Sequence, residues 1–248
     1  TFRVEDSVRR LLLAYGIECE VFAIPNCLVI SLETANGKPL SIMKRIGFHG
    51  NNLEAVERLN ALCRKICAER PEPGTAEQWL RQTKAECRVF STPMYYLGNF
   101  LGPAGFSLLF GGTLRDAFLA GLMGLIVGLV NRYMSKLETN PFFSTIAAAF
   151  AMAVPAYLLA GWDIADNIDA VIIGAAMILV PGLLITNSMR DLIYGDTNSG
   201  INRIVQVFLT AFAIALGTAA AWHVTAGVYG QTVSAVSVSY PVWAQCLA

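Results

Sequence analysis

Five long apolar runs follow one another from Pro93 onward, and they constrain the fold of this chain more than any other feature. A helix needs about 20 predominantly apolar residues to cross the hydrocarbon core of a bilayer, with some tolerance in either direction. Runs close to this length are separated by short polar connections. They occupy residues 93–110, 114–130, 144–161, 168–185 and 204–224. The sequence therefore predicts an α-helical integral membrane protein with five transmembrane helices.

Charged residues are concentrated before the first apolar run. Residues 1–92 hold 13 of the 18 Lys and Arg and 11 of the 18 Asp and Glu, which leaves 5 and 7 for the other 156 residues. The whole chain is only 15% charged, whereas soluble domains are about 25% charged. This distribution predicts a cytoplasmic head at residues 1–92, a transmembrane domain at 93–225 and an external tail of unknown role at 226–248. A net charge of zero argues against a nucleic-acid partner.

The head has the sequence pattern of a small α+β domain. Apolar residues at helical spacing predict helices, and short apolar runs between turn residues predict strands. The predicted helices are residues 4–15, 52–68 and 76–88, and the predicted strands are residues 18–23, 28–32 and 40–46. Pro25-Asn26 and Asn36-Gly37 are the predicted turns between the strands.

Basic residues near the ends of the apolar runs predict the orientation in the membrane. Loops rich in Lys and Arg stay on the cytoplasmic side. A cytoplasmic N-terminus leaves only Arg115 outside and places six basic residues inside, namely Lys84, Arg88, Arg132, Lys136, Arg190 and Arg203. We therefore expect a multi-pass protein with its N-terminus in the cytoplasm and its C-terminus outside.

The fourth apolar run contains the pair Pro181-Gly182 and is followed by polar residues. Proline removes a backbone donor and clashes with the preceding turn, so a helix is kinked or broken there. The positive end of a half-helix suits a carboxylate, and the free carbonyls at the other end suit an ammonium group or a cation. Arginine can add a bidentate carboxylate contact, and amide and hydroxyl groups can add hydrogen bonds. The predicted binding residues are Pro181, Gly182, Asn187, Ser188, Arg190 and Asp191.

A simpler interpretation of the same stretch stays open. The helix can be kinked with an ordinary loop after it, in which Arg190 anchors the chain at the cytoplasmic surface and forms an ion pair with Asp191. The following polar residues fit a turn and the cap of the fifth helix. These residues are Asp196, Asn198, Ser199 and Gly200.

Small residues in the apolar runs predict close helix contacts. Spacing of four between glycines lets membrane helices approach closely. Two such pairs occur, Gly98 with Gly102 and Gly124 with Gly128.

Asp116 lies beside Arg115 at the edge of a run, which favours a local ion pair. No carboxylate lies in the middle of a run, so the sequence indicates no proton carrier.

Features of soluble enzymes and metal sites are weak in this chain. Cys63 and Cys67 are four residues apart in a predicted helix, and we interpret them as buried reduced thiols because a metal site needs further ligands. His49 is interpreted as a surface residue of a loop. No nucleotide-binding loop and no nucleophile–base motif is present. We expect no catalytic residues, no metal and no cofactor.

Several landmarks in order resemble the bacterial threonine/serine exporter family in its shorter, split form. The similarity covers roughly residues 1–220, and the tail from residue 227 falls outside it. The strongest landmark runs from Thr186 through Leu192 and continues with Gly195-Asp196 and Ser199-Gly200. The other landmarks are Asn52-Leu53, Phe110-Gly111-Gly112, Asn140-Pro141-Phe142-Phe143 and Leu179-Val180-Pro181-Gly182.

The resemblance implies a component of a secondary transporter that exports small polar metabolites across the inner membrane. Threonine and serine are the substrates for which the family is named, and its split form is associated with dicarboxylates such as succinate. Split members pair with a smaller integral-membrane subunit, so the resemblance also implies a complex. The glycine- and alanine-rich spans suit close helix contacts, so we expect a homo-oligomer, a complex with that subunit, or both. The alternative function is a membrane-anchored enzyme or sensor that acts through its cytoplasmic head. Five closely spaced apolar runs favour the transporter, because an anchor needs only one.

Overall fold

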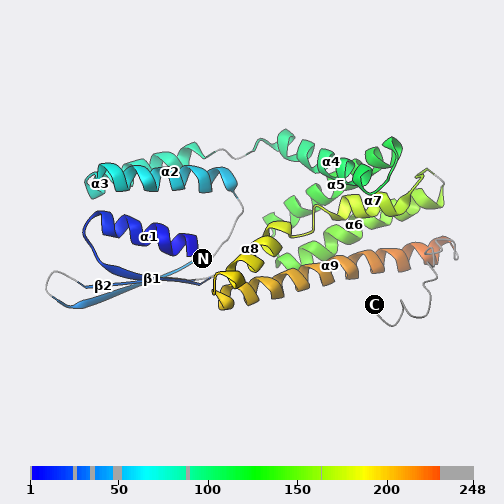
Figure 1. The fold of residues 1–248 in the computed structure, drawn as a ribbon. Coiled ribbons are helices and arrows are strands. Elements are labelled where there is room, and N and C mark those ends of the chain that lie inside the picture. Colours follow the sequence, from blue (N-terminus) through cyan, green and yellow to red (C-terminus); the bar gives the residue numbers. More distant parts are fainter. Residues whose placement is uncertain are drawn as a thin grey trace. The chain divides into compact units, whose positions relative to one another are not determined.

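The computed structural model describes residues 2–24, 27–33, 37–46, 52–87, 90–162 and 164–229. Contacts divide the chain into two compact units (Figure 1). The first unit comprises Thr1–Phe90 and Leu183–Val205, and the second comprises Ser91–Gly182 and Gln206–Ala248. The division predicted from composition, with a head, a transmembrane domain and a tail, stays a prediction.

The head contains three helices and a three-stranded sheet among its described residues. Helix α1 (Phe2–Ala14) is followed by strands β1 (Cys19–Ile24), β2 (Cys27–Glu33) and β3 (Pro39–Arg45), and then by helices α2 (Leu53–Glu69) and α3 (Pro73–Glu86). All six predicted elements are therefore present, with boundaries shifted by a few residues. The predicted turns at Pro25-Asn26 and Asn36 lie outside the described residues.

The sheet is antiparallel with strand order β1-β2-β3. Helix α1 packs against β1 and lies along one side of the sheet (Figure 1). Alternate residues of β1 are more buried, and Ala23 is 5% exposed. The Glu5 carboxylate accepts a hydrogen bond of 2.8 Å from the Ala23 amide, which ties α1 to the strand. Helix α2 packs against α1 and α3, and α3 begins at Pro73, a favourable first helical residue.

Six helices follow the head in the part of the chain that the structure describes. They are α4 (Thr92–Leu109), α5 (Leu114–Lys136), α6 (Pro141–Gly161), α7 (Ile168–Ala176), α8 (Gly182–Ile193) and α9 (Thr197–Tyr229). Asn140 and Asn167 accept amide hydrogen bonds at the starts of α6 and α7, and Thr113 and Asp116 form a reciprocal capping box at the start of α5. These caps explain where the three helices begin, and α6 begins three residues before the third apolar run.

Three of the described helices, α5, α6 and α9, are long and apolar enough to cross a membrane. The other two predicted spans differ from them. Helix α4 has 18 residues with Pro103 inside it, and the fourth run is divided between α7 with 9 residues and α8 with 12. The described residues are thus mostly helical and include three candidate spans, and the count of five stays a prediction.

Helices α5, α6 and α7 share a core of small and aliphatic side chains. Its central members are the fully buried Ala120, Val127, Met152 and Val171. Helix α4 packs against α5 and α7, and the glycines of α5 make this contact possible. A Cβ atom at Gly124 would lie 2.0 Å from the Asn99 carbonyl oxygen of α4. The predicted Gly124 and Gly128 pair therefore faces a neighbouring helix, whereas nothing lies within 4 Å of a Cβ atom at Gly98 or Gly102.

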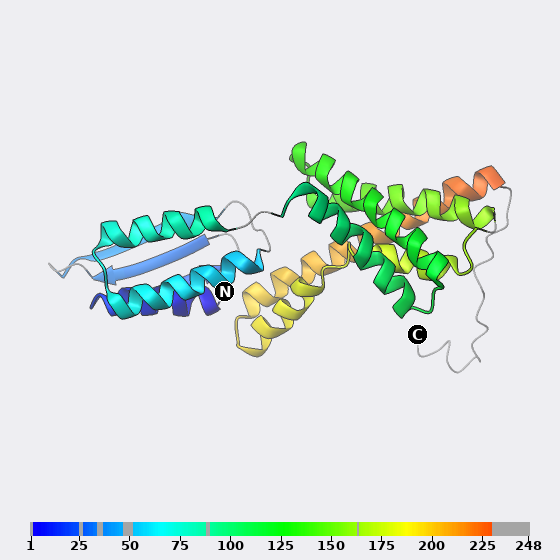
Figure 2. The same ribbon diagram turned by 90° about the horizontal axis from the view of Figure 1, so that it is seen from above.

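The polar segment after the fourth run is helical, which corrects the connection predicted over residues 186–203. Helix α8 continues to Ile193, and α9 already begins at Thr197. The Ser188 hydroxyl donates to the Ile185 carbonyl at 2.7 Å, so this polar side chain is accommodated within the helix. Figures 1 and 2 show α8 lying antiparallel beside the first turns of α9.

Candidate functional site

The predicted helix break lies between α7 and α8. Residues 177–181 are not α-helical, and Pro181 immediately precedes the first residue of α8. Local turns use several of the amides: Leu179 and Val180 donate to the Ala176 carbonyl at 2.8 and 3.3 Å, and Gly182 donates to the Val180 carbonyl at 2.9 Å. The break therefore satisfies part of its own backbone, and the start of α8 contributes the positive end of a helix dipole.

A buried carboxylate near the end of α8 forms the centre of a charged cluster. Asp191 is 2% exposed and lies between two arginines. Its Oδ2 atom is 3.3 Å from a guanidinium nitrogen of Arg203 in α9, and its Oδ1 atom is 3.9 Å from one of Arg190. The predicted ion pair between Arg190 and Asp191 is thus present, but Arg203 makes the shorter contact. Burial of a carboxylate is tolerated here because opposite charges surround it.

The turn between α8 and α9 holds this cluster together. Gly195 has a φ of +83°, a left-handed conformation that glycine adopts without strain. The Asp196 amide donates to the Asp191 carbonyl at 2.9 Å, and the Asp196 side chain accepts from the Ser199 amide at 3.2 Å. A Cβ atom at Gly200 would lie 2.6 Å from the Leu192 side chain. These contacts confirm the predicted turn and helix cap around Asp196.

The six predicted binding residues lie at the break and along the helix that follows it. Asn187, Ser188, Arg190 and Asp191 lie in the second half of α8, where Asn187 is half-buried and Ser188 is buried with its hydroxyl engaged by its own helix. Because α8 is one continuous helix, Gly182 and Arg190 are separated by roughly 12 Å along its axis. The predicted residues therefore extend from the break along α8, and their role as one binding site stays a prediction.

A second polar cluster lies at one end of the second unit. The Asp116 carboxylate is completely buried and accepts hydrogen bonds from the backbone amides of Thr113, Asp166 and Asn167 at 2.9, 2.9 and 3.2 Å. Arg115 pairs with Asp166 at 3.5 Å, so the predicted local pair of Arg115 with Asp116 is wrong. One carboxylate thus joins the turn between α4 and α5 to the loop between α6 and α7. Its oxygens are occupied by protein donors, which indicates a structural role.

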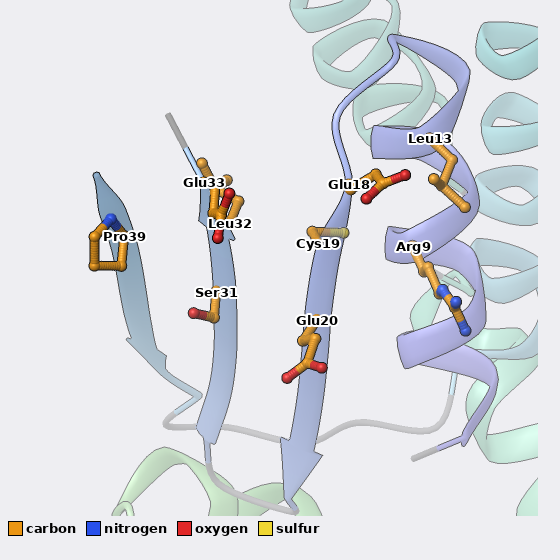
Figure 3. A pocket seen from close by; sticks show the side chains of 9 residues that line it. All are labelled: Arg9, Leu13, Glu18, Cys19, Glu20, Ser31, Leu32, Glu33 and Pro39. Atoms are coloured by element: carbon orange, nitrogen blue, oxygen red, sulfur yellow. The ribbon is translucent and has the colours of Figure 1, made fainter. Parts of the chain in front are cut away.

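The head contains an open pocket of about 600 Å³ between α1 and the sheet (Figure 3). Its charged lining residues are Arg9, Glu18, Glu20 and Glu33. Figure 3 shows the three carboxylates spread along the strands rather than gathered around one point. This arrangement does not form a compact site for a single cation or a small zwitterion.

The Cys63 thiol of the head is not activated for reaction. Cys63 and Cys67 are free and half-buried rather than fully buried, and the Cys63 thiol is 3.6 Å from the Ser7 carbonyl oxygen. Burial, and secondly the neighbouring Cys67, raise the pKa of Cys63 above its ordinary value. A raised pKa reduces the thiolate fraction at neutral pH, so Cys63 is not an activated nucleophile. His49 lies outside the described residues.

Comparison with known protein families decides which class of membrane protein this is. The profile of the family described as "Putative threonine/serine exporter" matches residues 1–225. The chain belongs to the threonine/serine exporter family. A search of curated proteins and a search of solved structures find no match to it. The family match confirms the resemblance seen in the sequence and identifies the chain as an exporter-type membrane protein.

The geometry adds two features of this exporter-family chain that sequence reasoning missed. Arg203 was predicted to lie on the cytoplasmic side, but its pairing with Asp191 follows only from the antiparallel arrangement of α8 and α9. The contacts of Asp116 with Asp166 and Asn167 join segments about 50 residues apart. In the sequence, the pair Gly195-Asp196 was the one signal of a turn between two helices that could have suggested the contact of Arg203 with Asp191.

Proposed function

We propose that this chain is one component of a secondary transporter that exports small polar metabolites across the bacterial inner membrane. Membership of the threonine/serine exporter family supports threonine and serine as substrates, and a dicarboxylate such as succinate is the alternative substrate class. The N-terminus is cytoplasmic in this proposal, and a smaller integral-membrane subunit completes the transporter. The function requires neither a cofactor nor a catalytic residue.

The proposed topology has five spans. Helix α4 is about 27 Å long, close to the hydrocarbon thickness of about 30 Å. Helices α7 and α8 would together form the fourth, discontinuous span, since they are only about 14 and 18 Å long. Discontinuous helices are typical of secondary transporters, in which the ends of half-helices bind substrate or coupling ions.

The single observation that carries the substrate proposal is that the two arginines at Asp191 contact its carboxylate at unequal distances. Arg203 makes the shorter contact with this carboxylate, while the side chain of Arg190 is 35% exposed at a distance of 3.9 Å. Arg190 is held less closely by Asp191 than Arg203 is, so its guanidinium is the group that a substrate carboxylate can reach. The planar guanidinium of Arg190 offers two parallel donors for that carboxylate.

The break before α8 forms the second place on the proposed path. Gly182 is exposed, and nothing lies within 4 Å of the position of a Cβ atom there. The Gly182 amide already donates to the Val180 carbonyl at 2.9 Å. The amides that follow it in the first turn of α8 have no carbonyl of their own helix to bind, which suits a carboxylate. We assign Gly182 and Arg190, whose Cα atoms are roughly 12 Å apart along α8, to successive positions of the substrate.

Transport by purified protein in liposomes tests this proposal. Vesicles loaded with radiolabelled threonine, serine or succinate should release the substrate when the chain is present together with membrane proteins that co-purify with it. Arg190→Lys should lower efflux at least about tenfold, because lysine keeps the charge but loses the bidentate fork. Arg115→Lys is the matched control, since Arg115 also pairs with an aspartate, at 3.5 Å from Asp166, and should transport normally.

A second pair of variants tests the break. Pro181→Ala with Gly182→Ala should join α7 and α8 into one helix, because alanine favours the helical conformation, and efflux should fall while membrane levels stay normal. Pro155→Ala is the matched control, since Pro155 lies inside the continuous helix α6. Normal efflux from both the Arg190 variant and the joined-helix variant would refute this assignment of the site. Failure of the parent protein to move any of the three substrates would refute the proposed function itself.

A further inference from the structure

The outer strand of the head's sheet has a free edge among the described residues. Strand β3 pairs with β2 on one side, and no described strand pairs with its other side. All seven residues of β3 are exposed, including Ile42 at 51%. Proteins usually protect such edges with proline or charged residues, because unpaired amides and carbonyls invite another strand. In β3 these residues occur only at the two ends, with Pro39 at the start and Lys44 and Arg45 at the end.

The unprotected middle of β3 continues an apolar row across the sheet. The strand register places Val21, Ile30 and Ile42 directly opposite one another. Residues paired in this way have side chains on the same face of the sheet. Val21 and Ile30 are half-buried, whereas Ile42 is exposed at the end of the row. A second copy of this row, placed edge to edge, would produce a line of six β-branched side chains, which pack well on a pleated surface.

A two-fold axis at Ile42 also brings opposite charges together. In this register Arg45 of a second copy lies opposite Pro39, and Pro39 is paired with Glu33 on β2. Figure 3 shows Glu33 and Pro39 at the same end of the two neighbouring strands. Arg45 of the second copy and Glu33 would then share a face with their Cα atoms roughly 10 Å apart, a distance that their side chains can bridge over the proline. The symmetry repeats this contact, because a two-fold interface uses the same surface twice.

We propose that the head binds a second copy of this chain by antiparallel pairing of the two β3 strands, centred on Ile42. The two sheets become one six-stranded sheet, and all seven residues of each β3 strand acquire a partner. A second copy is the occupant because the edge complements itself in both its apolar centre and its charged ends. This interface is independent of the proposed transport activity.

Disulfide cross-linking of the full-length chain in washed, broken membranes tests the proposal. Ile42→Cys should give a disulfide-linked dimer on oxidation, because residues facing each other across antiparallel strands have Cα atoms about 4.5 to 5.5 Å apart, within disulfide range. The side chain is half exposed, so this substitution should not disturb folding. Leu40→Cys is the matched control: Leu40 is 42% exposed, but its symmetry mate would lie roughly 13 Å along the strand. Co-expressed Leu40→Cys and Lys44→Cys copies should cross-link with each other.

Charge reversal supplies the second measurement. In the Ile42→Cys background, Arg45→Glu or Glu33→Arg alone should lower the cross-linked fraction roughly 2- to 30-fold, since two symmetric pairs are lost. The double reversal should restore it. The proposal is overturned if Ile42→Cys gives no more dimer than the parent with its native cysteines, or if Leu40→Cys alone cross-links equally well. Cross-linking of Ile42→Cys to a different membrane protein, or no restoration by the double reversal, also overturns it.

Discussion

Replacement of Gly124 by alanine should destabilise the contact between α4 and α5. The added Cβ atom would lie 2.0 Å from the Asn99 carbonyl oxygen and 2.4 Å from Cγ of Pro103. Neither atom belongs to a flexible side chain that can move aside, because one is backbone and the other is part of a proline ring. Helix α4 must therefore shift away from α5, and its contacts on both sides of this point weaken.

The size of the effect follows from two opposing contributions. Overpacking of an interior costs about 1 to 3 kcal/mol, and the obstruction by backbone places Gly124→Ala at the upper end, about 3 kcal/mol. Alanine is favoured over glycine in a helix by about 1 kcal/mol. The net loss is then about 2 kcal/mol, which corresponds to a thermal midpoint lower by about 4 to 8 °C for a chain of this size.

Gly98→Ala on the facing helix is the matched control. It changes the same residue type in the same four-residue spacing, but nothing lies within 4 Å of its Cβ position. We expect an unchanged or slightly raised midpoint, since only the gain in helix propensity of up to about 1 kcal/mol remains. The midpoints are measured by size-exclusion chromatography of detergent-purified protein after heating. Equal losses in the two variants, or no loss in Gly124→Ala, would show that the close approach of α4 to Gly124 is wrong.

Three further predictions concern other parts of the chain. Asp191→Asn removes the carboxylate between Arg190 and Arg203 and should lower the free energy of unfolding by about 1 to 3 kcal/mol. This loss is smaller than for a fully buried ion pair because both arginines retain solvent contact. An unchanged thermal midpoint in the same assay would contradict this prediction. The raised pKa of Cys63 should make alkylation of its thiol slower at pH 8 than alkylation of free cysteine, and the rate should keep rising above about pH 9. Peptide mass spectrometry measures this rate, and a rate equal to that of free cysteine argues against the burial of the thiol. Tags should be cytoplasmic at the N-terminus and external at the C-terminus in a protease-accessibility assay, and finding both on one side would refute the five-span count.

The order and type of the elements could be predicted from the sequence because each depends on local pattern. Apolar spacing revealed α1 and α2, and proline revealed the break before α8. The polar segment around Ser188 was assigned to a connection because a polar helix and a loop have similar composition. The structure shows that this segment is helical. The Ser188 hydroxyl donates a hydrogen bond to the Ile185 carbonyl, which lets a polar residue remain in the helix.

Contacts between distant segments could not be predicted in the same way. The two glycine pairs have identical spacing, yet only Gly124 and Gly128 meet a neighbouring helix, and only the packing of α4 on α5 shows this. The partner of Asp116 lies about 50 residues away, so its neighbour Arg115 was the obvious but wrong choice. For the candidate site, the residue types around Asp191 were predicted, whereas the second arginine required the fold of the α8–α9 hairpin.

Helix α9 is longer than a membrane is thick, and this excess has a consequence for any substrate path. Its 33 residues extend about 50 Å, while the hydrocarbon core accommodates about 30 Å. In the proposed topology, the apolar residues after Arg203 would fill that thickness and the polar first turns of α9 would project into the headgroup region. The salt bridge between Arg203 and Asp191 would then lie at the boundary between lipid and water, and the substrate carboxylate proposed to bind Arg190 would lie near the membrane surface rather than at the midplane.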